Sequence, residues 1–302
     1  MEGWIISRRT LEEINGENYS INRLFEEAEK QGITLTVFTP EQFDIIVTKD
    51  DRKSIRVKWE IRKLPDFVMP RMGAGTTYFA LAVIRHLERL WVFIVNGSEA
   101  IEMVKDKLYC NQVLAENNLP VPKTMLAKFP VNADLIEEQI GFPVVIKTLT
   151  WMKWDGVFLS RDKKSFSDTM RMVEWVGKSQ NLIFQQFIES SHGRDLRVFV
   201  VGWKVIATMQ RTGKEWEFRA NYSLGGSIEK YEVTPEIEWI ATQSAKILGL
   251  EVTWVDLLFD NDHFKICEAN SSPWFRGIEE STWVNISREI FSYIKVRLGI
   301  FE

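Results

Sequence analysis

Cysteine and histidine are scarce in this sequence of 302 residues, which has two cysteines and three histidines. The two cysteines, Cys110 and Cys267, are too few for a disulfide framework or a zinc site and indicate a reduced, cytoplasmic protein. The sequence has no apolar run of about 18 residues and no signal-peptide core at its start, so we expect no membrane segment. Basic side chains (38) do not exceed acidic ones (42), so no overall positive field predicts nucleic-acid binding.

The remaining composition is that of a globular protein, with 45% hydrophobic and 26% charged residues. A strand at 3–7, a helix that stops at Gly32 and a strand at 33–38 predict a small parallel sheet. We expect an α/β protein with α+β lobes, divided into units 1–96, 97–186 and 187–302. Further expected strands lie at 65–71, 92–95, 142–147, 157–159, 182–187, 195–201, 204–211, 251–259 and 263–269, with one more after a turn at 117–122 and a hairpin in 48–62. Helices lie at 77–90, 106–117, 164–177, 234–248 and 285–297, another begins at Ser98, and 212–229 is irregular.

Two carboxylates stand in apolar strands near the end of the chain. Asp256 lies in the first of two consecutive strands, and Glu268 and Asn270 lie in the second. Residues two apart on a strand share a face, so Glu268 and Asn270 point the same way and Asp256 can face them across the ladder. Oxygen ligands of this kind suit Mg²⁺. The alternative is that both carboxylates are edge charges in solvent.

A lysine and several further charged residues accompany these carboxylates. Lys147 ends an apolar strand, where an ammonium group can reach a phosphate while its stem stays packed. Together these groups predict a phosphate-rich, metal-bridged pocket, although each alone is typical of a solvated surface. The further residues are Asp195, Arg197, Arg211, Arg219 and Asn221.

Six short motifs occur in an order and spacing that resemble the ATP-grasp carboxylate–amine ligases, closest to the RimK-like glutamate ligases. The resemblance covers essentially the whole chain. The motifs are Asp106-Lys107-Leu108, Phe142-Pro143-Val144-Val145-Ile146-Lys147, Gly193-Arg194-Asp195-Leu196-Arg197, Phe218-Arg219-Ala220-Asn221, Val255-Asp256 and Glu268-Ala269-Asn270-Ser271-Ser272-Pro273. Met69-Pro70-Arg71-Met72-Gly73 resembles the signature of the family's N-terminal domain.

The resemblance implies an ATP-grasp fold that clamps ATP between two lobes, behind an N-terminal pre-ATP-grasp domain (1–96). The central lobe (97–186) would bind nucleotide, and the C-terminal lobe (187–302) would hold the metal and the acyl-phosphate. By motif, the site residues would be Lys107 and Lys147 for nucleotide phosphates, Gln186 and Phe187 for adenine, Asp195 for ribose with Arg197 in the same motif, Asp256, Glu268 and Asn270 for two Mg²⁺ (or Mn²⁺), and Arg211, Arg219 and Asn221 for the γ-phosphate and acyl-phosphate. The family more often shows Glu-Tyr where this chain has Gln186-Phe187.

The implied reaction is ATP-dependent amide formation through an acyl-phosphate, adding an amino acid, in the first place glutamate, to a carboxylate of a protein C-terminus or a small molecule. LysX-like or deazaflavin-cofactor-type ligases differ only in the acceptor, and assembly into a homo-oligomer is common in the family. Arg71 and Arg276 are candidates for holding a substrate carboxylate, with a surface salt bridge as the alternative.

Tryptophan is unusually frequent, with twelve residues against six tyrosines. In the resemblance, several tryptophans stand at glycine positions, where glycine supplies a positive φ and lets backbone N–H groups approach phosphate. Three interpretations are open: a non-binding ATP-grasp scaffold, an aromatic stacking surface, or a gene in which UGA encodes glycine. The seven clear positions are Trp91, Trp151, Trp154, Trp216, Trp254, Trp274 and Trp283, to which Trp59 and Trp203 may belong, whereas Trp4, Trp175 and Trp239 look ordinary.

Overall fold

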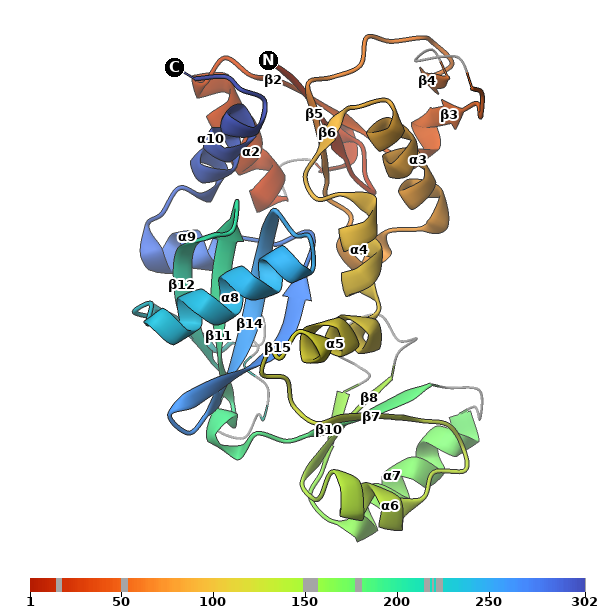
Figure 1. Cartoon of the computed structure of the whole chain (residues 1–302), viewed down its shortest axis with the longest axis vertical. Helices are drawn as coiled ribbons and strands as arrows, with labels where there is room; N and C mark the ends of the chain where they lie inside the picture. Colours follow the sequence, from red (N-terminus) through yellow and green to blue (C-terminus); the bar gives the residue numbers. More distant parts are fainter. Residues whose placement is uncertain are drawn as a thin grey trace.

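The computed structural model shows, in the part of the chain it describes, three sheets of four or five strands and a two-stranded sheet, together with their helices (Figure 1). The structure describes residues 1–14, 18–49, 54–148, 157–176, 181–214, 218, 220 and 225–301. Within these ranges every helix is too short or too polar to cross a bilayer.

The N-terminal unit is built on a four-stranded parallel sheet with strand order β2-β1-β5-β6. This confirms the parallel sheet predicted from the start of the sequence. Its helices begin at polar caps, since the side chain of Asn18 accepts from Ile21 N and that of Thr77 accepts from Ala80 N. The elements are β1 (Glu2–Ile6), α1 (Leu11–Ile14), α2 (Tyr19–Lys30), β2 (Thr34–Phe38), β5 (Phe67–Pro70), α3 (Tyr78–Arg89) and β6 (Phe93–Ile94), with an antiparallel pair β3 (Phe43–Ile45) and β4 (Ile55–Val57) beside them.

The central lobe is a four-stranded antiparallel sheet with strand order β7-β10-β8-β9, covered by two helices. Its core is separate from the rest and is centred on Phe166 and Phe184, whose rings lie 5.4 Å apart. The elements are β7 (Thr124–Ala127), α6 (Ala133–Gln139), β8 (Val144–Thr148), β9 (Val157–Ser160), α7 (Lys163–Val176) and β10 (Leu182–Gln186).

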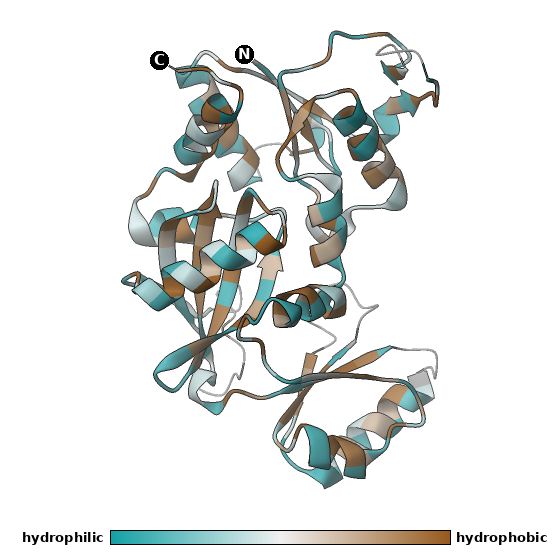
Figure 2. Cartoon of the chain, in the orientation of Figure 1, coloured by the Kyte–Doolittle hydropathy of each residue, from teal (hydrophilic) through white to brown (hydrophobic). Residues whose placement is uncertain are grey.

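The C-terminal lobe is a five-stranded antiparallel sheet with strand order β13-β12-β11-β14-β15. Figure 2 shows hydrophobic residues concentrated in β11 and β12, which agrees with their burial on both faces. The elements are β11 (Arg194–Val201), β12 (Lys204–Thr212), β13 (Ser227–Lys230), α8 (Pro235–Ile247), β14 (Val252–Asp260), β15 (His263–Asn270), α9 (Arg276–Thr282) and α10 (Ile286–Arg297).

Two helices that precede the central sheet pack on the C-terminal lobe. Ala100 of α4 (Ser98–Lys105) and Cys110 and Leu114 of α5 (Lys107–Glu116) belong to the same buried cluster as α8 and strands β14 and β15. The expected unit 97–186 therefore contains helices whose buried side chains join another core. The boundaries of the three units remain predictions.

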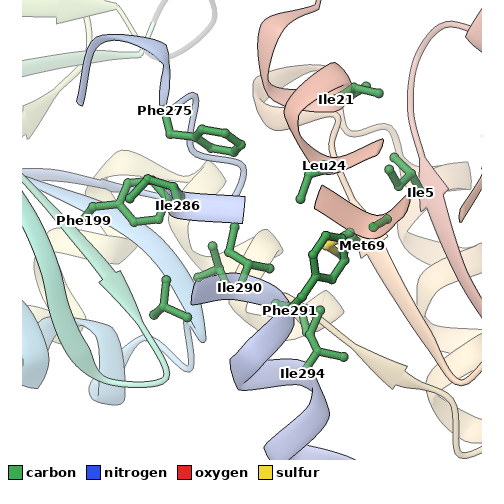
Figure 3. Close-up of a cluster of buried hydrophobic side chains, with 14 of the residues drawn as sticks. Ile5, Ile21, Leu24, Met69, Phe199, Phe275, Ile286, Ile290, Phe291 and Ile294 are labelled. Atoms are coloured by element: carbon green, nitrogen blue, oxygen red, sulfur yellow. The ribbon is translucent and has the colours of Figure 1, made fainter. Parts of the chain in front are cut away.

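The N-terminal unit and the C-terminal lobe share one hydrophobic core. Figure 3 shows Phe291 of α10 directed toward Leu24 and Met69, with Ile294 further along the same helix, while Phe199 and Phe275 extend the cluster into the C-terminal lobe. Polar contacts join the same two parts, since Tyr19 Oη donates to Glu279 Oε2 (2.7 Å). This extensive burial predicts that the N-terminal unit and the C-terminal lobe move as one body.

Some expected elements were wrong in detail. The strand pair expected in 48–62 is β3 and β4 and lies at 43–57, and 212–229, expected to be irregular, ends in β13. Helices α1, α6 and α9 were not expected, because they are only four to seven residues long and give a weak helical period. The other expected strands and helices occur within a few residues of their predicted bounds.

Four tryptophans occupy left-handed backbone conformations. In the described part of the chain, seven non-glycine residues have a positive φ, and four of them are Trp59 (65°), Trp91 (64°), Trp203 (63°) and Trp283 (60°). Trp59 and Trp203 are the second residues of two-residue hairpin loops, and Trp91 and Trp283 follow the ends of α3 and α9. All four are places that favour glycine. Trp4, by contrast, is buried in β1, and Trp175 and Trp239 lie in helices.

Candidate active site

A cleft between the central and C-terminal lobes brings together most of the predicted site. Two adjoining pockets there share Lys107, Lys147, Gln185, Cys267 and Glu268 as lining residues. One pocket also includes Asn270. The other is also lined by Gln186, Phe187, Asp195 and Asp256.

The three predicted metal ligands lie on one ladder. Asp256 of β14 is directly opposite Glu268 of β15, and Asn270 is opposite Trp254, two residues from Asp256 along β14. Asp256 is 1% exposed, so the alternative that it is an edge charge in solvent is wrong. Glu268 remains partly accessible, with 27% of its side chain exposed. The register thus places the three side chains on one face of the sheet, as the two-residue period predicted.

Asp256 is held by two arginines from neighbouring strands. Arg197 of β11 donates through Nε and Nη2 to both carboxylate oxygens of Asp256, at 2.8 and 2.7 Å. Arg211 of β12 donates from Nη2 to Asp256 Oδ2 at 2.8 Å and binds Asp195 with two bonds, at 2.7 and 2.6 Å. The result is a buried, alternating network of two carboxylates and two guanidinium groups.

This network shifts the two carboxyl groups in opposite directions. Burial alone would raise the pKa of Asp256, but Arg197 and Arg211 outweigh it and hold the pKa below its usual value. Burial and the nearby Asp256 raise the pKa of Asp195 to about 6, against the opposing effect of Arg211. Asp256 is therefore the firmly ionised member of the pair, as a cation ligand must be.

The predicted phosphate-binding lysines enter the cleft from two different elements. Lys147 lies on β8, between Ile183 and Val157 of the neighbouring strands, and its Nζ donates to Gln185 Oε1 at 2.6 Å. Lys107 is the first residue of α5, next to the capping residue Asp106. Its Nζ lies 3.8 Å from Glu268 Oε2, an exposed pair that contributes little to stability.

Gln186 and Phe187 lie at the connection between the lobes, at the end of β10. Gln186 N donates to Lys123 O at 2.8 Å, which pairs this end with the residue preceding β7. Phe187 lies edge-on to the ring of His192, with centroids 6.0 Å apart. This position is consistent with the predicted adenine contact, which stays a prediction.

The remaining residues singled out from the sequence either lie outside the described residues or make contacts elsewhere in the fold. Arg219 and Asn221 lie outside the described residues, as do Trp151, Trp154 and Trp216. Arg71 Nη2 donates to Pro273 O at 2.5 Å. Arg276 forms an exposed ion pair with Glu280 at 2.8 Å, which is the surface salt bridge named above as the alternative to binding a substrate carboxylate. Trp254 is stacked under Arg197, whose Cζ is 3.4 Å from the ring centre, whereas Trp274 lines a separate pocket with Arg8 and Arg71.

Two residues of the cleft were not predicted from the sequence. Gln185 is 3% exposed and connects Lys147 to Thr124 Oγ1, which its Nε2 reaches at 3.0 Å. A glutamine within the apolar strand 182–186 was the available signal. Cys267 lines both pockets, and burial raises the pKa of its thiol to about 11, so it is not an activated nucleophile.

The residues present suit magnesium and a nucleoside triphosphate. Carboxylate and amide oxygens on one face are the ligands that Mg²⁺ prefers, and the ammonium groups of Lys107 and Lys147, which line the same two pockets, match phosphate oxygens. Within the described ranges no group of three or more His, Cys, Asp and Glu side chains could hold a metal. Any cation held here would thus depend on two carboxylates and the amide of Asn270, leaving positions for phosphate and water.

Comparisons with known proteins agree with this geometry. Residues 104–294 match the RimK-like ATP-grasp domain, and residues 11–101 match the RimK PreATP-grasp domain. The chain is 36% identical over 278 residues to a protein of Thioalkalivibrio sulfidiphilus (strain HL-EbGR7) named "Probable alpha-L-glutamate ligase", which covers 92% of this chain and 91% of that protein. It is 37% identical over 284 residues, 93% of each chain, to a protein of the same name from Legionella pneumophila (strain Corby).

Solved structures share the fold at low sequence identity. The ATP-grasp ligase PsnB, in a complex with a precursor variant, Mg and ADP, superposes with a TM-score of 0.75 at 18% identity, covering 98% of both chains. D-alanine–D-alanine ligase from Bacillus anthracis complexed with ATP gives a TM-score of 0.67 at 15% identity, covering 99% of this chain and 98% of that one. With its ATP-grasp fold and two matched domains, the chain belongs to the RimK-like ATP-grasp family and is an ATP-grasp ligase.

Proposed function

We propose that the chain joins an amino acid, glutamate in the first place, to a carboxylate acceptor at the expense of ATP. The acceptor would be a protein C-terminus or a small molecule. The observation that carries the proposal is the cleft in which Lys147 of one sheet and Glu268 of the other line the same two pockets. The relatives named alpha-L-glutamate ligase support glutamate as the amino acid.

Each part of the cleft would have its own role. ATP with Mg²⁺ supplies the phosphoryl group that turns a carboxylate into an acyl-phosphate, from which an amine displaces phosphate to give the amide. Lys107 and Lys147 would bind the phosphates, and Asp256, Glu268 and Asn270 would hold the cation. Arg211, next to Asp256, would stabilise charge on the transferring group. The predicted roles of Arg219 and Asn221 at the γ-phosphate belong to this proposal too.

ADP release tests the proposal directly. Purified protein with ATP and Mg²⁺ is incubated with glutamate and a panel of carboxylate acceptors, including peptides. ADP is measured, and the amide products are identified by mass spectrometry. We expect sustained ADP release, beyond one ADP per protein molecule, only when amine and acceptor are both present, with one amide bond per ADP. Release of ADP without any amide product, under every combination, would contradict a ligase with this substrate class.

A binding scaffold without turnover is the second candidate. The observation that favours it is that both oxygens of Asp256 already accept hydrogen bonds from arginines. In that case nucleotide would bind in the cleft, but no ADP would form with any pair of substrates. The same assay, combined with a nucleotide-binding titration, separates the two functions.

Removal of the Lys147 ammonium group is expected to weaken ATP binding. Lys147→Met keeps an unbranched apolar stem and removes the charge that faces the cleft, so we expect about a 10- to 100-fold rise in the Kd for ATP, since contacts to ionised groups contribute about 1.5–3 kcal/mol. Isothermal titration calorimetry measures the change. Lys163→Met is the matched control, because Lys163 lies in the same lobe but pairs with Asp134 and Glu137. Equal affinities in the two variants would remove Lys147 from the nucleotide site.

A further inference from the structure

The segment that follows β15 is held by side chains from the N-terminal unit. Asn96, which follows β6, donates from Nδ2 to Ser271 O at 2.7 Å. Arg71, which follows β5, donates from Nη2 to Pro273 O at 2.5 Å. Because β5 and β6 are neighbouring parallel strands, both residues stand at the carboxyl edge of the N-terminal sheet. That edge therefore contacts the segment directly after Asn270.

Asn96 uses the full bonding capacity of its amide group. Besides Ser271 O, its Nδ2 donates to Val252 O at 2.6 Å, and its Oδ1 accepts from Glu251 N at 2.7 Å and Val252 N at 2.9 Å. A primary amide has two N–H donors and two acceptor positions, and all four are used here. Asn96 is 1% exposed, so no other side chain of its size could satisfy these four partners.

The segment is also fixed from the sheet side. Thr253 Oγ1 donates to Asn270 O at 2.9 Å, and the Asn270 side-chain oxygen accepts from Ser272 N at 2.9 Å. Ser271 and Ser272 are 8% and 5% exposed, so the segment is buried between the two parts of the molecule. The position of the Asn270 side chain thus depends on where Ser271, Ser272 and Pro273 are held.

We propose that Asn96 and Arg71 are positioning residues for the cation site, which set the orientation of Asn270 by fixing the main chain of residues 271–273. This inference rests on the proposed role of Asn270 as a cation ligand. It makes the N-terminal sheet part of the catalytic apparatus of the C-terminal lobe. Groups that orient metal ligands change metal affinity about 10- to 100-fold when they are replaced.

The test compares two asparagine-to-aspartate substitutions at the same interface. Asn96→Asp keeps the shape and both acceptor bonds but places a carboxylate oxygen against Val252 O and Ser271 O. Asn285→Asp is the matched control: Asn285 caps α10 through Arg288 N, which aspartate also does, and donates to Glu27 Oε2 of α2 at 2.9 Å. Each variant thus strains the contact between the N-terminal unit and the C-terminal lobe, but only Asn96→Asp does so at residues 271–273, next to Asn270.

The measurement is Mn²⁺ affinity in the presence of ADP, by calorimetry or electron paramagnetic resonance, beside a thermal unfolding curve. We expect Asn96→Asp to weaken Mn²⁺ binding about tenfold or more and Asn285→Asp to leave it unchanged. Arg71→Met, which removes the bond to Pro273 O, is the second variant and is expected to act in the same direction. Mn²⁺ affinities that equal the wild-type value in both Asn96→Asp and Arg71→Met would overturn the proposal, whatever happens to the melting temperature.

Failure of this inference can be told apart from failure of the proposed function. If the wild-type chain binds Mn²⁺ with ADP but never forms an amide, the ligase proposal is wrong and the binding comparison still decides the positioning role. If the wild-type chain binds no cation, the role of Asn270 and with it the positioning role are wrong. Under turnover conditions the positioning role predicts a higher Mg²⁺ requirement for Asn96→Asp at an unchanged KM for glutamate.

Discussion

Replacing Asp256 by asparagine is expected to abolish ADP release and to lower the free energy of unfolding by about 3–5 kcal/mol. The carboxylate is 1% exposed and accepts three hydrogen bonds from Arg197 and Arg211. An amide directs N–H groups at one of these guanidinium groups and leaves buried positive charge without compensation. Urea unfolding and a coupled ADP assay measure the two effects.

Glu268→Gln is the control that separates chemistry from folding. Glu268 faces Asp256 across the ladder, but 27% of its side chain is exposed and its ion pair with Lys107 is long, at 3.8 Å. We expect the unfolding free energy to change by less than about 1 kcal/mol. Activity should fall by about 10²–10³-fold, since a charge that stabilises the transition state is lost. Full ADP release by either variant would contradict a cation site at these residues.

Replacing Trp59, Trp91 and Trp283 together by glycine is expected to raise the free energy of unfolding by about 2 kcal/mol. Each residue has a positive φ, which costs a non-glycine residue about 1–2 kcal/mol, more than the entropy cost of about 0.5–1 kcal/mol that glycine brings. The three side chains are 83%, 89% and 91% exposed, so little packing is lost. They lie in separate elements, so the effects should add. Thermal and urea unfolding provide the measurement.

Trp239→Gly is the control for the triple variant, because here the same substitution is expected to lower the stability. Trp239 is less exposed than these three, at 51%, and lies inside helix α8, where glycine costs about 1 kcal/mol. We therefore expect this variant to be less stable than the wild-type chain. If the triple variant is also destabilised, the left-handed conformations do not strain the chain.

The same geometry bears on why tryptophan stands at these positions. Trp91 and Trp283, singled out from the sequence as glycine-like, both have a positive φ, and so do Trp59 and Trp203. We expect the corresponding gene codons to be UGA, translated as glycine in the native host. The intact mass of the protein from that host checks this expectation, and UGG codons at 151, 154 and 254 would contradict it.

The class of the fold and the facing arrangement of the three proposed cation ligands follow from local features of the sequence. The strand–helix–strand start predicts the parallel sheet, and the two-residue period of consecutive strands predicts that Glu268 and Asn270 share a face with Asp256, because both are local features of the chain. The lysines and the acidic residues of the cleft were likewise recognisable by their motifs.

Which distant groups contact these residues depends on how the strands and helices pack together. The pairing of Asp256 with Arg197 and Arg211 depends on the strand order of the sheet. The packing of α4 and α5 on the C-terminal lobe cannot be read from any periodic pattern in their own sequences. The contact of Asn96 with Ser271 joins residues 175 positions apart. Such contacts form because buried polar groups must find partners once the units pack together, and a local pattern does not specify where the partner lies.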